Sequence, residues 1–360
     1  MASLGVGILG AGWVAGEYVK AFRDLPQTEV AGLYSRTPGR ASELLQALGV
    51  EAREYFQEEE LFDDPAVDIV VSCTPPEVRP RHVVRAAETG RHVVIEKPVS
   101  LSMAGVEKIR QAVASSGVKT VTSFVLRWNP MIETIRRLVD DGIIGELIYA
   151  EADYWNPGNP ARPQPWWVTK SGAGSAFLEG GCHAADAIRY LAGEVAEVSA
   201  VSCPAKRSEL YEYDPIVVAS LTFENGAVGK TSTVLDAETP YTFNIRLFGT
   251  DGTIQNNRVF SPKHYPGALD YWEFPTILPD TSDVAHHPFS REISHFVECI
   301  TADVESHASI HDTYKSMALV FAIDESAASG GRPISVAEVG EVVDRATAPD
   351  PAARGGATLS

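Results

Sequence analysis

The sequence has little cysteine and no long hydrophobic run, and it lacks a basic N-terminal segment. Its four cysteines include no CxxC pair, and in a chain of this length such cysteines are typical of reduced thiols rather than of a disulfide framework. No apolar stretch approaches the roughly 20 residues of a membrane-spanning helix. The opening Met1-Ala2-Ser3-Leu4 has no basic residue, which a secretion signal would carry. These absences predict a cytoplasmic protein without a membrane partner.

Basic residues are also scarce. The chain has 30 Lys and Arg against 48 Asp and Glu, and its formal net charge is −18. Such an acidic balance repels phosphate backbones and argues against nucleic acid as a partner. At 360 residues, with 44% hydrophobic and 22% charged residues, the sequence is typical of a soluble globular protein with more than one domain.

The first third of the chain alternates between strand-like and helical patterns. Apolar runs predict strands at 4–9, 30–34, 67–73, 92–96 and 118–124, and helical spacing predicts helices at 17–25, 40–48, 82–88 and 103–115. This alternation with short turns favours a parallel, doubly wound sheet. We therefore predict an α/β fold whose residues 1–123 form a dinucleotide-binding Rossmann domain.

After residue 124 the pattern changes. Helical stretches at 131–141 and 183–192 enclose an irregular segment, 154–174, that is rich in Pro, Gly and Trp; strand-like runs follow at 196–203, 215–224, 227–235 and 241–249, and helices at 289–302 and 312–329. Strands with so little helix between them favour one mainly antiparallel sheet. The prediction is a second α/β domain over 124–345 and a disordered tail over 346–360, which is rich in Pro, Ala and Gly.

A glycine turn follows the first predicted strand. Gly10 permits the tight turn from strand to helix, Gly12 lets the backbone approach a pyrophosphate, and Ala15 keeps the helix close to the strand. Trp13 and Val14 continue the turn, and the N-terminus of the helix that follows faces the phosphates. This GxGxxA pattern in a βαβ context predicts NAD or NADP as the cofactor; a glycine-rich turn without a ligand is the alternative.

The end of the second predicted strand bears on the choice between the two cofactors. NAD-specific sites usually have Asp or Glu here, but this chain has Ser35, followed by Arg36 and Thr37. No carboxylate repels a 2′-phosphate, and Arg36 can pair with one. The sequence therefore leans to NADP, although Ser35 can also bind a free ribose hydroxyl and Arg36 can be a solvated surface residue.

Three blocks of sequence are more telling than the turn alone. They are Gly7-Ile-Leu-Gly-Ala-Gly12, Glu96-Lys97-Pro98, and Glu179-Gly-Gly-Cys-His183-Ala-Ala-Asp186. In this order and spacing the chain resembles the Gfo/Idh/MocA family, the oxidoreductases named for glucose–fructose oxidoreductase and inositol dehydrogenase. The resemblance implies a second domain with a large open sheet, and hydride transfer between a nicotinamide and a carbon–oxygen centre, usually of a sugar or cyclitol. It also adds Thr74, Pro75, Glu96 and Lys97 to the cofactor-binding residues.

The resemblance also implies the catalytic residues. The family's lysine and its Asp-x-x-x-His pair fall on Lys97, Glu179 and His183, with Glu in place of Asp. An alcohol must lose its proton as hydride leaves carbon; a histidine tuned by a carboxylate and a nearby lysine can accept that proton, and Lys97 can stabilise the alkoxide. Asp186 matches a further carboxylate of the pattern. A surface role for Lys97 and a purely structural role for Glu179 are the alternatives.

Aromatic and basic residues mark a substrate site. Sugar rings stack on aromatic faces while their hydroxyls take directional hydrogen bonds. The predicted substrate-binding residues are Lys97, Arg127, Trp155, Arg162, Trp166, Trp167, Glu179 and His183. Tryptophans that cap the sheet or an oligomer interface are the alternative. His264, His286 and His287 match no metal-ligand spacing, and we predict no metal site.

These observations favour an NAD(P)-dependent dehydrogenase or reductase of a sugar, glycoside or cyclitol. A glycoside-cleaving enzyme that oxidises its substrate transiently and a non-catalytic cofactor-binding protein are the competing hypotheses. Aglycone release without net NAD(P)H distinguishes the first of them from a dehydrogenase. Because an exposed sheet face usually needs a partner, we also expect a homo-oligomer, either a dimer or a tetramer.

Overall fold

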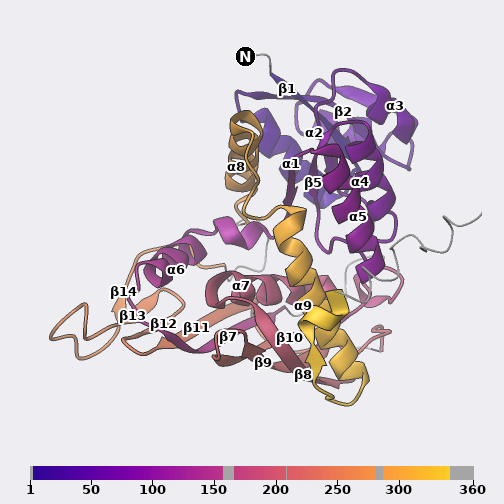
Figure 1. Ribbon diagram of the computed structural model, residues 1–360. Coiled ribbons are helices and arrows are strands. Elements are labelled where there is room, and N and C mark those ends of the chain that lie inside the picture. The colour runs from indigo at the N-terminus through magenta and orange to yellow at the C-terminus, as the bar shows by residue number, and fades with distance from the viewer. Residues whose placement is uncertain (1–2, 157–165, 208, 280–286, 341–360) are drawn as a thin grey trace, which may run out of the picture.

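A computed structural model describes residues 3–156, 166–207, 209–279 and 287–340. Two parts lie one above the other, with a parallel sheet and its helices at the top of Figure 1 and a large second sheet at the bottom. Arg162, His286 and the predicted tail over 346–360 lie outside the described residues. No helix in the described ranges is long and apolar enough to cross a membrane.

The first sheet has six parallel strands in the order β3-β2-β1-β4-β5-β6. The strands are β1 (Leu4–Leu9), β2 (Thr28–Tyr34), β3 (Arg53–Tyr55), β4 (Ile69–Ser72), β5 (His92–Ile95) and β6 (Thr120–Thr122). The strand order reverses between β1 and β4, and in such sheets ligands bind outside the carboxyl ends of the strands at this point. The predicted Rossmann fold is confirmed.

Helices cover both faces of this sheet, as parallel strands require. They are α1 (Trp13–Arg23), α2 (Arg40–Ala47), α3 (Glu58–Asp63), α4 (Arg79–Glu88) and α5 (Met103–Ser116). Two short elements, β3 and α3, were not predicted, because their residues are mostly charged and carry no apolar run. The helix predicted at 82–88 begins earlier, at Arg79, with Pro80 in the first turn, where no N–H is needed.

The second sheet has nine strands in the order β14-β13-β12-β11-β7-β10-β9-β8-β15. They are β7 (Leu147–Trp155), β8 (Val195–Cys203), β9 (Ile216–Phe223), β10 (Val228–Val234), β11 (Thr242–Gly249), β12 (Thr253–Gln255), β13 (Arg258–Phe260), β14 (Trp272–Glu273) and β15 (Ile334–Ser335). The pairings are antiparallel except between β7 and β10, which run parallel. The mainly antiparallel sheet is confirmed.

Strand β7 was missed by the sequence analysis, although it lies at the centre of this sheet. Ala150, Ala152 and Tyr154 point into the core, whereas Glu151 and Asp153 alternate with them on the other face. Two carboxylates in one strand hide its apolar alternation. The segment predicted as irregular from residue 154 therefore begins as the end of β7.

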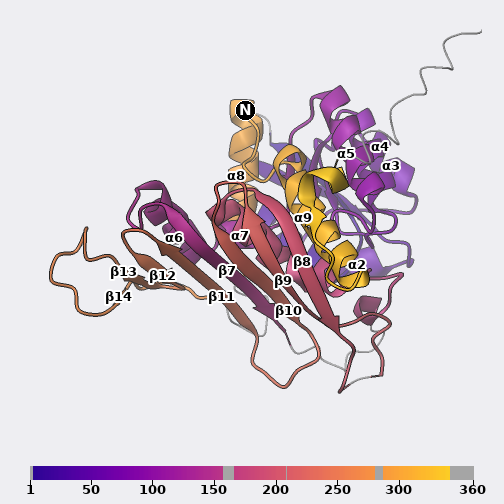
Figure 2. The same ribbon diagram turned by 60° about the horizontal axis from the view of Figure 1, so that its bottom comes forward.

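Helices cover only one face of the second sheet. α6 (Pro130–Asp140), α7 (Cys182–Ala192) and α9 (Ile310–Ala328) lie between this sheet and the Rossmann part. No helix of the described residues crosses the face that is turned forward in Figure 2. α8 (Phe289–Ala302) instead packs on α1, where the rings of Tyr18 and Phe289 lie 5.1 Å apart. The proposed boundaries between the two domains stay predictions.

Candidate active site

The glycine turn after β1 has the geometry that a dinucleotide needs. Gly10 has φ +102°, and a Cβ there would lie 2.8 Å from the carbonyl oxygen of Cys73, so only glycine fits. A Cβ at Gly12 would meet no atom of the described chain within 4 Å, so the backbone faces open space. α1 starts at Trp13 without a side-chain cap or an acidic residue in its first turn. Its N–H groups are therefore available to an anion, and the turn fits a pyrophosphate.

The loop after β2 has an exposed cation. Arg36 is exposed, and the Ser35 hydroxyl accepts a hydrogen bond from the N–H of Thr37 over 3.2 Å. Glu54 of β3 is a carboxylate that sequence reasoning missed here. It accepts hydrogen bonds from the Gly39 N–H (3.1 Å) and from the Ser42 hydroxyl. Both of its carboxylate oxygens are therefore hydrogen-bonded to neighbouring parts of the chain.

A buried arginine ties together the loops that follow β4 and β5. Arg79 is 4% exposed and donates to the carbonyl oxygens of Thr74 (2.5 Å) and Pro98. The Thr74 hydroxyl lies 3.0 Å from Nδ1 of His82, and Pro75 is exposed. Sequence reasoning missed Arg79, because an arginine at the start of a helix is usually a surface residue.

Below Lys97 lies a pair of buried carboxyl groups. Glu96 accepts hydrogen bonds from the Tyr18 hydroxyl and from the Lys97 N–H, each over 3.0 Å, and burial raises its pKa. Glu292 of α8 is fully buried, and neither carboxyl oxygen has a hydrogen-bond partner among the described residues. Burial and the charge of Glu96 raise the pKa of Glu292 well above its usual value. The Glu96 side chain thus supports the backbone of Lys97 from within the core.

Lys97 reaches from the first domain to the second. Its Nζ donates a hydrogen bond to the carbonyl oxygen of Glu179 over 2.9 Å. Glu179 lies in a π-helical turn, η3 (Phe177–Gly181), that runs directly into α7. Such turns are rare and frequently occur at functional sites. A Cβ on Gly180 would lie 2.3 Å from the Tyr154 ring, so glycine lets this turn approach β7.

His183, in the first turn of α7, lies in an aromatic cage. Its ring centre is 6.0 Å from that of Tyr154, 6.2 Å from Phe124 and 6.0 Å from His287. Nδ1 is buried without a partner among the described residues. Burial holds the pKa of His183 well below its usual value, and the charges of Lys97 and His287 lower it further. At neutral pH the ring is therefore uncharged and can accept a proton.

Within the described residues no carboxylate contributes to the shift of the His183 pKa, and the expected tuning by a carboxylate stays a prediction. Glu179 instead lies near two tyrosines of the segment before β9. After burial, its charge is the largest cause of the raised pKa values of Tyr211 and Tyr213. His287, which the sequence analysis rejected as a metal ligand, takes part in the cage. Burial lowers the pKa of His287 to about 4, and Lys97 contributes.

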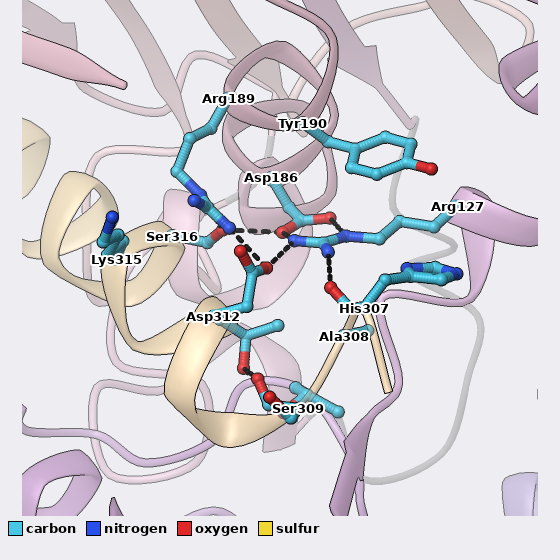
Figure 3. A network of polar contacts seen from close by, with 12 residues as sticks. Arg127, Asp186, Arg189, Tyr190, His307, Ala308, Ser309, Asp312, Lys315 and Ser316 are labelled. Atoms are coloured by element: carbon cyan, nitrogen blue, oxygen red, sulfur yellow. Dashed lines mark hydrogen bonds and ion pairs between the residues drawn. The ribbon is translucent and has the colours of Figure 1, made fainter. Parts of the chain in front are cut away.

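Arg127 and Asp186 belong to a structural network and not to the cleft (Figure 3). Arg127 lies in a short 3₁₀ turn, η1 (Val125–Trp128), and is 2% exposed. Its Nε and Nη2 donate to Asp186 over 2.8 and 2.6 Å, and Nη2 lies 2.7 Å from Asp312 of α9. The structure thus places the Arg127 guanidinium in ion pairs, and its predicted contact with a substrate stays a prediction. Its guanidinium connects η1 to α7 through Asp186 and to α9 through Asp312.

The tryptophans predicted to bind substrate lie in different places. Trp155 donates to the Ser232 hydroxyl over 3.0 Å, on the face of β7 opposite to Tyr154, so the structure does not bring it together with the residues around His183. Trp166 and Trp167 lie in a short turn, η2 (Trp166–Val168), with Trp166 exposed. Trp167 lies 5.8 Å from the Tyr211 ring, and through this tyrosine it lies near Glu179.

Comparisons with known proteins agree with this arrangement. The sequence model of the oxidoreductase family with an NAD-binding Rossmann fold matches residues 4–124, and that of the GFO/IDH/MocA C-terminal domain matches residues 132–255. Scyllo-inositol 2-dehydrogenase (NAD(+)) of Bacillus subtilis (strain 168) is 28% identical over 276 residues, which are 73% of this chain and 75% of that protein. D-xylose 1-dehydrogenase (NADP(+)) 2 of Haloferax volcanii is 25% identical over 325 residues, 90% of this chain and 97% of that protein.

A solved structure shares the fold. That of levoglucosan dehydrogenase in complex with NADH superimposes with a TM-score of 0.85 at 22% identity, covering 93% of this chain and 99% of that chain. A levoglucosan dehydrogenase from Pseudarthrobacter phenanthrenivorans is 24% identical over 291 residues, 71% of this chain and 74% of that protein. Since both halves of the sequence match models of one family, the chain belongs to the Gfo/Idh/MocA family of NAD-binding oxidoreductases.

Proposed function

We propose that the protein is a nicotinamide-dependent dehydrogenase or reductase that acts on a hydroxyl or carbonyl carbon of a sugar, glycoside or cyclitol. The observation that carries the proposal is the meeting of Lys97 with the turn that leads to His183. Lys97 Nζ lies 2.9 Å from the Glu179 carbonyl, and its charge helps to keep His183 neutral. A cation and a neutral base beside a dinucleotide turn are what the oxidation of an alcohol requires.

Each residue has a role in the proposed reaction. The bound nicotinamide supplies the hydride acceptor or donor. The backbone at Gly12 and the first N–H groups of α1 hold the pyrophosphate. Lys97 donates a hydrogen bond to the reacting oxygen and stabilises its negative charge, while His183 takes the hydroxyl proton at Nε2. Because burial and Lys97 disfavour a charged His183 ring, this proton is readily passed on, or returned in the reducing direction.

A polyhydroxylated ring is the substrate class that we propose. Tyr211 and Tyr213 lie near Glu179, and Trp167 packs against Tyr211. Aromatic faces of this kind bind the C–H faces of such rings. The similar proteins named for inositol, levoglucosan and D-xylose support the same class.

The test is to incubate the purified protein with NAD⁺ or NADP⁺ and a panel of inositols, levoglucosan, pentoses, hexoses and aryl glycosides. A dehydrogenase gives the absorbance of reduced nicotinamide. Lys97→Met should abolish this signal while cofactor binding, followed by fluorescence titration, is retained. Release of aglycone without reduced nicotinamide would instead indicate the glycoside-cleaving alternative, and cofactor binding without any turnover would indicate the non-catalytic one.

We further propose that NADP is the preferred cofactor. Arg36 is exposed, and Ser35 stands where a carboxylate would repel a 2′-phosphate. Arg36→Ala should lower kcat/KM for NADP⁺ by about tenfold, because a charge-assisted pair is lost, and leave that for NAD⁺ unchanged. Equal effects on both cofactors would contradict this preference.

Self-association through the uncovered face of the second sheet is part of the proposal. Val201, Val218, Val228 and Phe248 are 61%, 42%, 53% and 40% exposed. Exposed apolar residues on one sheet face favour a partner. Light scattering should give a dimer or a tetramer, and Val218→Lys should lower the mass. The cytoplasm is the proposed location, since all four cysteines are free thiols.

A further inference from the structure

A carboxylate outside the cleft contacts the start of the catalytic turn. Asp324 lies on α9, which packs against η3 and α7. Its Oδ2 accepts a hydrogen bond from the Ser175 hydroxyl over 2.6 Å. This is its one hydrogen bond within the described residues. Ser175 directly precedes the helical turn that carries Glu179.

Ser175 in turn fixes the backbone of η3. Its Oγ accepts a hydrogen bond from the Leu178 N–H over 3.0 Å, and its carbonyl oxygen accepts one from the Glu179 N–H over 2.9 Å. A hydroxyl has one proton to give. Since Ser175 gives that proton to Asp324, a lone pair of Oγ is directed at the Leu178 N–H, and the helix start is capped.

The chain of contacts ends at the catalytic lysine. The Glu179 carbonyl, which η3 presents, accepts the hydrogen bond from Lys97 Nζ over 2.9 Å. We propose that Asp324 is a positioning residue of the active site, which orients Ser175 and thereby fixes the turn that holds Lys97. This inference rests on the proposed function, because it assigns Lys97 to the reaction.

The charge state of Asp324 decides how the contact works. Burial raises the pKa of Asp324 to about 7, and the Ser175 hydroxyl lowers it; no charged group in the described parts of η3, α5, α7 or β8 adds to the shift. When ionised, the Asp324 carboxylate can only accept hydrogen bonds. Its negative charge also interacts favourably with the positive end of the nearby helix dipole. When protonated, it can donate to Ser175 Oγ and compete with the Leu178 N–H. The hydrogen bond from the Leu178 N–H to Ser175 Oγ, and with it the η3 turn, should therefore be more stable above about pH 7 than below it.

Hydrogen exchange tests the positioning without any substrate. Exchange of the peptide that spans η3 is followed by mass spectrometry at about pH 6 and about pH 8, corrected for the intrinsic rate. We expect Asp324→Ala to speed exchange of the Leu178 and Glu179 amides by about fivefold at the higher pH, as for a lost helix cap. Asp324→Asn, which keeps an acceptor oxygen but does not titrate, should remove the pH dependence. Unchanged exchange in both variants overturns the proposal.

Kinetics then tests the consequence for Lys97. Asp324→Ala and Ser175→Ala should each lower kcat about fivefold with little change in KM for the cofactor, and the double variant should lose no more than either alone. The pH profile of Asp324→Asn should lack the ionisation near 7. Glu325→Ala is the matched control, because this neighbour is half-exposed and pairs only with Arg332 among the described residues. Additive losses or an unchanged pH profile would contradict the inference. If no substrate is turned over, the proposed function fails, while the exchange result still decides the role of Asp324.

Discussion

The two ends of helix α7 differ in how their buried polar groups are satisfied. At its start, His183 is 3% exposed, and its Nδ1 has no partner among the described residues. Further along, Asp186 and Arg189 are equally buried but paired with Arg127, Asp312 and Ser316 (Figure 3). Buried polar groups are normally hydrogen-bonded. The difference teaches that α7 is fixed by its later turns, so that its first turn can stay open for a ligand.

Burial disfavours the charged form of the side chains at both ends of α7, but the resulting pKa depends on the neighbouring charges. Burial alone would lower the pKa of Arg127, yet Asp186 and Asp312 raise it above its ordinary value, so the guanidinium stays charged. At His183, burial lowers the pKa, and Lys97 and His287 lower it further. One end of the helix is therefore a permanent ion network, and the other is a neutral acceptor.

The largest expected effect is on turnover, at the open end. His183→Asn keeps a polar side chain of similar size but cannot act as the base. We expect kcat to fall by about 10²–10⁴-fold, the usual contribution of a general base, while the unfolding temperature changes little. Steady-state kinetics and a thermal melt measure the two quantities. A variant that keeps its kcat would remove His183 from the reaction and leave it as a structural residue.

The next effect is on stability, at the paired end. Arg127→Met removes the cation that pairs with Asp186. The buried Asp186 carboxylate then keeps the hydrogen bond from the Ser316 hydroxyl but loses its ion pair with Arg127. Breaking a buried ion pair by removing one partner costs about 3–5 kcal/mol, which urea denaturation should reveal. Arg40→Met is the control, because Arg40 and Glu43 form an exposed pair that contributes less than about 1 kcal/mol. Equal losses in the two variants would mean that the network is not structural.

The two ends should also respond to acid in different pH ranges. His183 titrates in the unfolded chain near pH 6.5 but stays neutral when folded. Since only the unfolded state takes up this proton, stability should fall as the pH drops below about 6.5, by up to about 1.4 kcal/mol per pH unit. His183→Asn should show a correspondingly smaller slope in urea denaturation between about pH 6.5 and 5. An identical slope would show that His183 titrates normally in the folded state.

The ion network should lose its stabilisation only at lower pH. Burial opposes ionisation of Asp312, but Arg127 and Arg189 outweigh it and leave the pKa below the usual value of 3.8. The stabilisation from this group is therefore present above about pH 4 and is lost as the pH falls through the lowered pKa. A second acid limb in this range is the expected signature, and it should be smaller in Arg127→Met, where Arg189 still pairs with Asp312.

Sequence patterns predicted the Rossmann part well, because its strands are continuous apolar runs and its glycine turn has a fixed geometry. They failed for β7, whose uncovered face carries Glu151 and Asp153 and so breaks the apolar alternation. The ion pairs of Arg127 could not be predicted from the local sequence either. A basic residue next to an aromatic one indicates a ligand in sequence, but its partners Asp186 and Asp312 come from distant helices, which no local spacing reveals.

For the candidate site, the family resemblance selected Lys97, Glu179 and His183, which the fold brings together. What it missed are residues that act from elsewhere in the chain. Arg79 and Glu292 are charged types that are seldom buried, and His287 reaches the cage only because α8 crosses back to the first domain. In the part of the chain that the structure describes, the groups that surround His183 and shift its pKa are aromatic rings and Lys97, which the local sequence did not indicate.

The smallest effect is expected at the solvent edge of the same network. Lys315 pairs with Glu194 over 3.1 Å, and their side chains are 55% and 33% exposed, whereas those of Arg127 and Asp186 are 1% and 2% exposed. Lys315→Met should therefore cost less than about 1 kcal/mol in urea denaturation, and less still at high salt. Glu194 also keeps its contact with Arg189, so the variant leaves no carboxylate unpaired. A loss as large as that of Arg127→Met would show that charge rather than burial governs this network. In that case the contrast between the two ends of α7 could not be attributed to the absence of water.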